Sequence, residues 1–240
     1  MIRCYGATHT GRRRPNNEDG FALLPEHHAA VVADGMGGAQ CGEVGSSITL
    51  SAVSAYLAAP AADLTPSELA VAAIEFANRE VLAAARVRSE CEGMGSTIVL
   101  AVWSLPHVVL ANVGDSRAYL FRSGELRQLS YDQSFANELR VQLGIGEDSL
   151  RGMPNQHVLT MAVGTFDRVL VRTHLERLEP GDRILLCSDG LYRPVDDWTL
   201  NQILAAGGSL QEQVSRLIDC ANEYGGPDNV TAVLMEYEGS

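Results

Sequence analysis

Acidic residues stand at the ends of the apolar, strand-like runs of this sequence. In two places, Asp34-Gly35 and Asp189-Gly190, a glycine follows the aspartate at once. The acidic positions at such ends are Glu18, Asp19, Asp34, Asp115, Asp189 and Asp228. A single Asp–Gly pair is ordinary turn chemistry and is more often a turn than a ligand. Carboxylates that converge at one sheet edge, however, repel one another unless a cation neutralises them.

The residue types around these carboxylates indicate a hard divalent cation. No clustered His or Cys accompanies them, and His27-His28 is too isolated to count as a metal site. Ligand sets made only of oxygen select Mg²⁺ or Mn²⁺ over zinc. The adjacent glycines allow backbone carbonyls to approach an ion closely. The sequence therefore predicts a dinuclear carboxylate site for Mg²⁺ or Mn²⁺.

One arginine, Arg14, stands close to the first acidic pair. An arginine beside a metal-binding carboxylate suits bidentate capture of a phosphate, whereas Arg12 and Arg13 are expected to be solvated. All 18 basic residues are arginine, so the P-loop, Schiff-base and kinase lysines are excluded. No G-x-G-x-x-G, G-x-S-x-G, H-E-x-x-H or EF-hand motif occurs either.

The composition narrows the class of protein. The chain has 240 residues, of which 46% are hydrophobic, which is enough for one sizeable core. Its net charge of −12 disfavours nucleic-acid binding, and no apolar run is long enough to span a bilayer. We therefore expect a soluble, cytoplasmic protein. Five scattered cysteines without a C-x-x-C motif are expected to be buried, reduced thiols: Cys4, Cys41, Cys91, Cys187 and Cys220.

Short apolar runs rich in β-branched residues predict strands. They cover Ala29–Ala33, Thr97–Trp103, Val108–Val113, Ala118–Phe121, Ile184–Cys187 and Thr231–Tyr237. Only four residues separate the second run from the third, and Ser123-Gly124 turns the fourth back on itself. Such short connections make antiparallel hairpins, which differ from the helical crossovers of a doubly wound fold.

Helices are expected between and after these strands. The first covers Gly42 to Ala58, and the second opens at a capping box formed by Thr65 and Glu68. Later helices are expected over 134–143, 198–205 and 210–224. Antiparallel strands with grouped helices predict an α+β layered sandwich, and residues 1–240 form a single domain because no linker or repeat divides them.

Six ordered motifs carry a resemblance to a known family. They are Arg14–Asp19, Ala33–Gly38, Gly93–Thr97, Ala111–Arg117, Leu186–Leu191 and Gly226–Thr231. In this order the sequence resembles the type-2C metal-dependent serine/threonine protein phosphatases, the PPM family, in a bacterial form. The resemblance implies a four-layer α-β-β-α sandwich: two mostly antiparallel sheets flanked by helix pairs, with metals in a cleft at one end.

The resemblance also assigns roles. Asp34 is similar to the carboxylate that bridges two metals, with the Gly35 carbonyl on one of them. The other ion is bound by residues that resemble Asp189 and Asp228. Ligands that bind directly or through water resemble Glu18 and Asp19. The position of a third ion is similar to that of Asp115 together with Asp189. Arg14 resembles a phosphate clamp. This implies that a metal-bridging hydroxide attacks phosphoserine or phosphothreonine, with Arg14, Asp34 and Asp189 as the catalytic residues.

The sequence departs from the family pattern in the cleft region. Met36 stands where many eukaryotic relatives carry a histidine proposed as general acid, and Gln133 stands where histidine is expected. We interpret the second change as neutral. Residues 135–160 correspond to the variable flap beside the cleft, which we expect to select substrates.

Several functions remain compatible with these residues. The first is a monomeric phosphatase that acts on phosphorylated proteins and opposes a bacterial serine/threonine kinase. The alternatives are a partner-switch phosphatase acting on an anti-sigma-factor antagonist, a non-catalytic phosphoprotein-binding pseudophosphatase, and a metal hydrolase of nucleotides. The retained carboxylates disfavour the pseudophosphatase, and the acidic charge disfavours the nucleotide hydrolase.

Overall fold

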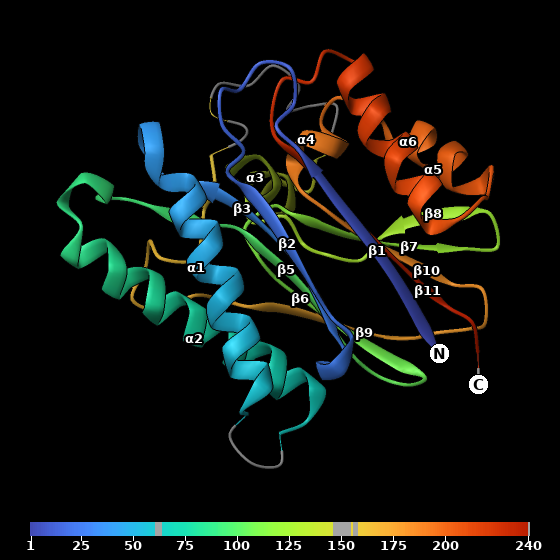
Figure 1. The fold of residues 1–240 in the computed structure, drawn as a ribbon, viewed down its shortest axis with the longest axis horizontal. Coiled ribbons are helices and arrows are strands. Elements are labelled where there is room, and N and C mark those ends of the chain that lie inside the picture. Colours follow the sequence, from blue (N-terminus) through green and yellow to red (C-terminus); the bar gives the residue numbers. More distant parts are fainter. Residues whose placement is uncertain (61–63, 146–154, 156–157, 240) are drawn as a thin grey trace.

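Two antiparallel sheets form the centre of the protein (Figure 1). The computed structural model of the chain describes residues 1–60, 64–145, 155 and 158–239. The strands are β1 (Ile2–His9), β2 (Asp19–Leu24), β3 (Ala29–Met36), β4 (Gly95–Ser96), β5 (Ile98–Ser104), β6 (His107–Val113), β7 (Arg117–Arg122), β8 (Glu125–Gln128), β9 (Arg172–Arg177), β10 (Arg183–Cys187) and β11 (Val230–Tyr237). One sheet has the order β1-β11-β10-β7-β8, and the other β2-β3-β5-β6-β9, with β4 paired to the end of β3.

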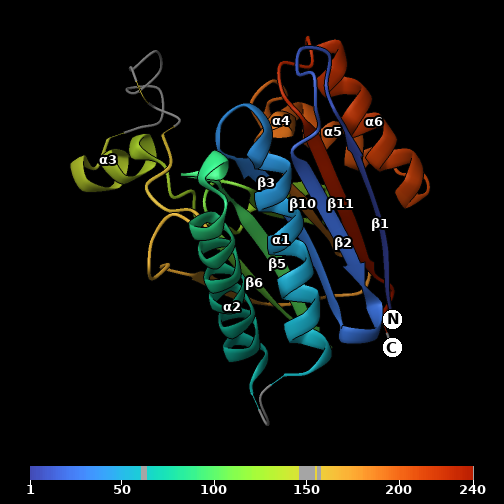
Figure 2. The ribbon, with the colours of Figure 1, turned by 60° about the vertical axis from the view of Figure 1, so that its left-hand side comes forward.

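Helices cover the outer face of each sheet, as Figure 2 shows from a second direction. The helices are α1 (Gly38–Ala58), α2 (Pro66–Val87), α3 (Phe135–Leu143), α4 (Asp189–Tyr192), α5 (Asp197–Ala205) and α6 (Leu210–Glu223), with 3-10 turns at Pro25–His27 and Ser89–Cys91. Helices α1 and α2 pack on β3, β5 and β6, whereas α6 packs on β1 and β11 and α5 on β8. The predicted four-layer α+β sandwich is confirmed.

The alternation of side chains along β3 and β5 builds two of the three cores. Ala29 and Val31 face α1 and α2, whereas Ala30 and Val32 face the opposite sheet. Because successive strand residues point to opposite faces, a continuous apolar run is needed where both faces are covered. A third core joins the outer face of the β10–β11 sheet to α5 and α6. The two sheets and their helices therefore form one rigid support for the loops at their ends.

The expected strands are all present, and so are both predicted hairpins, β5–β6 and β7–β8. At the turn of the second hairpin, Ser123 and Gly124 have positive φ angles of 53° and 85°, as a two-residue hairpin turn requires. Helix α2 begins with the predicted capping box of Thr65 and Glu68. Helix α1 begins at Gly38, four residues before the expected start.

The expectation that all five cysteines are reduced thiols is wrong. Cys41 and Cys91 form a disulfide across a sequence separation of 50 residues, while Cys4, Cys187 and Cys220 are free thiols. The bond ties the first turns of α1 to the 3-10 turn that precedes β4. Scattered spacing could not reveal this pair because the two cysteines meet only through the packing of α1 against that turn.

Within the described residues, none of the helices combines the length and the apolar character needed to cross a membrane.

Candidate active site

A cleft of about 650 Å³ lies at one end of the sandwich, where β3, β10 and the loops before β2, β7 and β11 meet. Seven of the eight residues singled out in the sequence line it: Arg14, Glu18, Asp34, Gly35, Asp115, Asp189 and Asp228. The eighth, Asp19, lies beside the cleft and is only 9% exposed. The structure thus brings together carboxylates from five separate segments of the chain.

Asp19, which is buried, and Asp34, which is half-buried, form the floor of the carboxylate cluster. They are directly opposite each other on β2 and β3, so their side chains share one face of the sheet. The hydroxyls of Ser188 and Thr231 donate to Oδ2 of Asp19 at 2.6 and 2.8 Å. Among the described residues, Oδ1 of Asp19 has no hydrogen-bond partner although it is buried. A buried carboxylate oxygen without a donor is a site at which a cation is favourable.

Burial and mutual repulsion raise the pKa of several of these acids. Burial raises the pKa of Asp19 to about 6 and that of Asp189 to about 7, and it also raises the pKa of Glu18. The pKa of Asp34 is raised well above its usual value, first by burial and then by the charge of Asp19 and of the other aspartates around the cleft. Negative charge therefore exceeds the positive charge available in the cleft. This is the condition that a bound divalent cation relieves.

The donor set fits Mg²⁺ or Mn²⁺ because its atoms are carboxylate and backbone oxygens. In the described part of the chain, no three acidic, His or Cys side chains already form a complete ligand set around one point. Magnesium commonly keeps several waters in protein sites, which agrees with such a sparse set.

Two glycines allow the backbone segments of the site to approach one another. A Cβ on Gly35 would lie 1.9 Å from the carbonyl oxygen of Gly42 in α1, and a Cβ on Gly190 would lie 1.8 Å from that of Asn229. Contacts this short are impossible for any side chain. The glycines that follow Asp34 and Asp189 therefore allow α1 and the last loop to close around the aspartates.

Asn229 holds the loop that carries Arg14. Its Nδ2 donates to the carbonyls of Thr10 and Asn16, both at 2.8 Å, and its Oδ1 accepts from the backbone N–H of Glu18 at 2.8 Å. Arg14 itself donates from Nη2 to Oδ2 of Asp228 at 2.8 Å, and its side chain is 51% exposed. The loop thus places a solvent-accessible guanidinium at the rim of the cluster.

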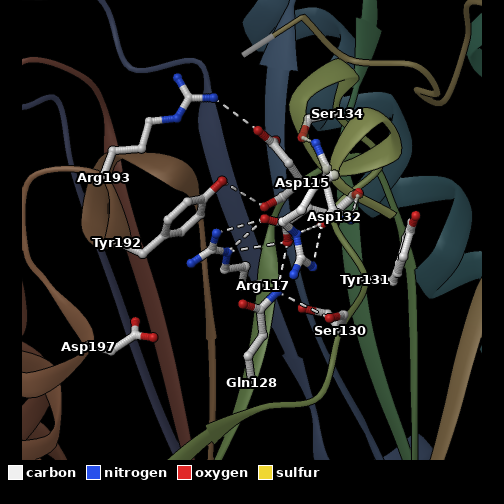
Figure 3. A network of polar contacts seen from close by, with 12 residues as sticks. Asp115, Arg117, Gln128, Ser130, Tyr131, Asp132, Ser134, Tyr192, Arg193 and Asp197 are labelled. Atoms are coloured by element: carbon white, nitrogen blue, oxygen red, sulfur yellow. Dashed lines mark hydrogen bonds and ion pairs between the residues drawn. The ribbon is translucent and has the colours of Figure 1, made fainter. Parts of the chain in front are cut away.

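Two arginines near the cluster were not identified in the sequence (Figure 3). Arg193 contacts the carboxylates of Asp115 and Asp189, and Arg117 forms a forked ion pair with Asp132. The available signal was the four-residue separation of Asp189 and Arg193, which lets the two side chains meet on one helical turn. The partners Asp115 and Asp132 lie far from these arginines in sequence, so no local pattern reveals them.

Gln133, whose presence in place of histidine we interpret as neutral, connects two backbone segments. It is buried; its Oε1 accepts from the N–H of Gly114 at 2.9 Å, and its Nε2 donates to the carbonyl of Leu170 at 2.7 Å. Gln133 therefore supports the turn that presents Asp115. Val158 and Leu159 of the predicted flap line the cleft, whereas residues 146–154 and 156–157 lie outside the described residues.

Comparisons with known proteins agree with this geometry. The model of the family described as protein phosphatase 2C matches residues 5–235. A serine/threonine phosphatase, stp, of Listeria monocytogenes is 36% identical over 235 residues, which are 95% of this chain and 93% of that protein. The crystal structure of the Mycobacterium tuberculosis serine/threonine phosphatase PstP/Ppp is 32% identical, has a TM-score of 0.90, and the match covers 99% of both chains.

A further structure bears on the metals. The catalytic domain of the phosphatase PstP, in complex with two manganese ions, is 33% identical with a TM-score of 0.86, and the match covers 98% of this chain and 97% of that one. Both the expected family and its metal dependence are confirmed. The chain belongs to the protein phosphatase 2C family of metal-dependent serine/threonine phosphatases.

Proposed function

We propose that the carboxylate cleft holds two Mn²⁺ or Mg²⁺ ions and hydrolyses phosphoserine and phosphothreonine in proteins. The observation that supports this most strongly is the excess of buried carboxylates, with Asp19 and Asp34 side by side and an exposed arginine at the rim. When bound, the two ions supply Lewis-acid chemistry and lower the pKa of water close to neutral.

The ligand roles follow the positions of the side chains. Asp34, whose pKa is raised by burial and by the charges of Asp19 and Asp189, would bind both ions. The carbonyl of Gly35 would bind one of them. Asp189, whose pKa is raised first by burial and further by the charges of Asp115, Asp228 and Asp19, would hold the other ion together with Asp228. Glu18 and Asp19 would bind the ions directly or through water. The buried Oδ1 of Asp19, which has no hydrogen-bond partner among the described residues, supports this.

Arg14 would bind the phosphate of the substrate. A guanidinium carries five N–H donors in a planar fork, and the bond to Asp228 uses one nitrogen. A phosphate at the rim can therefore be bound through the remaining donors, and Asp228 keeps the side chain directed toward the cluster. The positive charge also stabilises the charge that spreads over the equatorial oxygens during transfer.

We also propose a domain organisation, an oligomeric state, a location and a class of substrate for this protein. Residues 1–240 would form one catalytic domain with a flap over about 135–160, acting as a monomer in the cytoplasm. Its substrates would be phosphoproteins that include a bacterial serine/threonine kinase and the targets of that kinase. The similarity to serine/threonine phosphatases over nearly the whole chain supports the substrate class.

Hydrolysis of a phosphothreonine peptide in the presence of Mn²⁺ tests the proposal. We expect turnover with Mn²⁺, none with EDTA, and little with a nucleoside triphosphate. Asp34→Asn should bind the peptide but fail to hydrolyse it, while Asp167→Asn, at an exposed surface carboxylate, should behave as the wild type. Full turnover in EDTA would contradict the metal mechanism, and peptide binding without turnover would indicate a pseudophosphatase.

A further inference from the structure

Arg193 lies between two carboxylates of the cleft. Its Nη2 is 2.9 Å from Oδ2 of Asp115, and its Nη1 is 2.8 Å from Oδ2 of Asp189. Asp115 and Asp189 are both buried, and the side chain of Arg193 is 31% exposed where it lines the cleft. One guanidinium thus joins two carboxylates that flank the paired strands β7 and β10 at the same end of one sheet.

The position of Arg193 is fixed from two directions, and Figure 3 shows the side that faces Asp115 and Tyr192. Arg193 directly follows α4, whose first residue is Asp189, so the ion pair closes over one helical turn. The preceding residue, Tyr192, donates its hydroxyl to the backbone carbonyl of Asp115 at 2.9 Å. The guanidinium of Arg117 lies 3.7 Å from the centre of the Tyr192 ring, and Arg117 is held in turn by Asp132. The segment that carries Arg193 is therefore anchored to the same turn as Asp115.

Two facing, buried carboxylates require positive charge between them. A divalent ion can supply it reversibly, whereas an arginine supplies it permanently because the guanidinium does not lose its proton. An ion placed between Asp115 and Asp189 would have to displace Arg193 from both carboxylates. The displaced guanidinium would then lie beside the ion, where like charges repel.

We propose that Arg193 takes the place of a third divalent ion in this protein. The chain then binds two ions, and the position between Asp115 and Asp189, where the sequence allowed a third, is filled by a side chain. Arg193 acts as a positioning residue, because it directs Asp189 toward the two-ion site without contacting the reacting atoms. This inference rests on the proposed two-ion function of the cleft.

Counting bound metal tests the inference independently of activity. Each protein is dialysed to equilibrium against Mn²⁺ at a concentration that saturates the wild type, and the bound manganese is measured by atomic emission. We expect two ions in the wild type, three in Arg193→Met, and two again in Arg193→Met/Asp115→Asn. Arg193→Lys keeps a positive charge and should hold two. The surface variant Arg127→Met, which loses only an exposed ion pair with Glu176, should also hold two.

The possible outcomes separate this inference from the proposed function. Three ions in the wild type, or two in a folded Arg193→Met, would overturn the role of Arg193 and leave the two-ion site intact. No bound ion in the wild type would overturn the proposed function itself. If Arg193→Met fails to fold by circular dichroism, Asp115→Asn in the wild-type background decides: an unchanged count of two supports the inference, and a loss of one ion contradicts it.

Discussion

Replacing Asp19 by asparagine should make the metal-free protein more stable, although it removes a candidate metal ligand. Burial raises the pKa of Asp19 from 3.8 to about 6, a shift of about 2 pKa units. At about 1.4 kcal/mol per unit, the charged side chain costs the folded protein about 3 kcal/mol at pH 8. The asparagine Oδ1 can still accept from Ser188 and Thr231, and its amide can donate toward Asp34. We therefore expect a gain of about 2–3 kcal/mol in the free energy of unfolding in EDTA.

The sign of the effect sets its pH dependence. An acid whose pKa is raised by folding binds its proton more tightly in the folded state, so the protein loses stability as the pH rises from the unfolded pKa to the folded one. The difference between Asp19→Asn and the wild type should be small near pH 4, grow up to about pH 6, and stay constant above it. Saturating Mn²⁺ should reverse the order, because ligand binding stabilises the folded wild type by mass action.

Urea unfolding, followed by the fluorescence of the buried Trp103, measures this directly. The control is Asp182→Asn, which removes an equally buried carboxylate that is paired with Arg122 at 2.6 Å. This variant should be less stable than the wild type at pH 8, because it removes the closest of the three carboxylates that pair with Arg122. Two results together would refute the argument that uncompensated charge accumulates in the cleft. The first is a urea midpoint for Asp19→Asn in EDTA at pH 8 that is lower than that of the wild type. The second is a stability difference between the two proteins that does not change with pH.

Two further perturbations test other parts of the structure. Arg14→Ala should lower kcat/KM on a phosphopeptide about 10–100-fold, because it removes a charge-assisted bidentate contact. The control Arg12→Ala should change kcat/KM little. Equal losses in the two variants would show that Arg14 is only part of a general basic patch. Reduction of the Cys41–Cys91 disulfide, which closes a loop of 50 residues, should lower the free energy of unfolding by up to about 4 kcal/mol. Urea unfolding with and without dithiothreitol measures this, and the double variant Cys41→Ala/Cys91→Ala should show no response to the reductant.

The strands that were missing from the sequence-based expectation are mostly edge strands. β1 borders one sheet, and β2 and β9 border the other. β9, for example, has the sequence RTHLER and is mostly exposed, so no apolar run reveals it. The inner strands β3 and β5 are buried on both faces and are therefore continuous apolar runs in the sequence. Burial on two faces thus determined what could be predicted.

At the site, the carboxylates were predictable from the sequence, whereas the two arginines beside them were not. The carboxylates were identifiable because each one ends a strand or begins one, which is a local pattern. Arg193 and Arg117 were missed because their partners Asp115 and Asp132 come from other elements. These contacts depend on how the layers pack, and of the contacts made by the two arginines only the i,i+4 pair of Asp189 and Arg193 is visible in the local sequence.

The pairing of β1 with β11 has a practical consequence for engineering. Ile2 pairs with Tyr237 at one end, and His9 pairs with Val230 at the other, close to Asp228. Both termini therefore emerge together, as Figure 1 shows, about 27 Å from the cleft along a strand of eight residues. A tag, a surface tether or a fused reporter at either terminus should leave the cleft open. A short peptide joining the two ends should also permit circular permutation. The new termini could be placed in a turn at the end of the sheet away from the cleft, such as Ser123-Gly124.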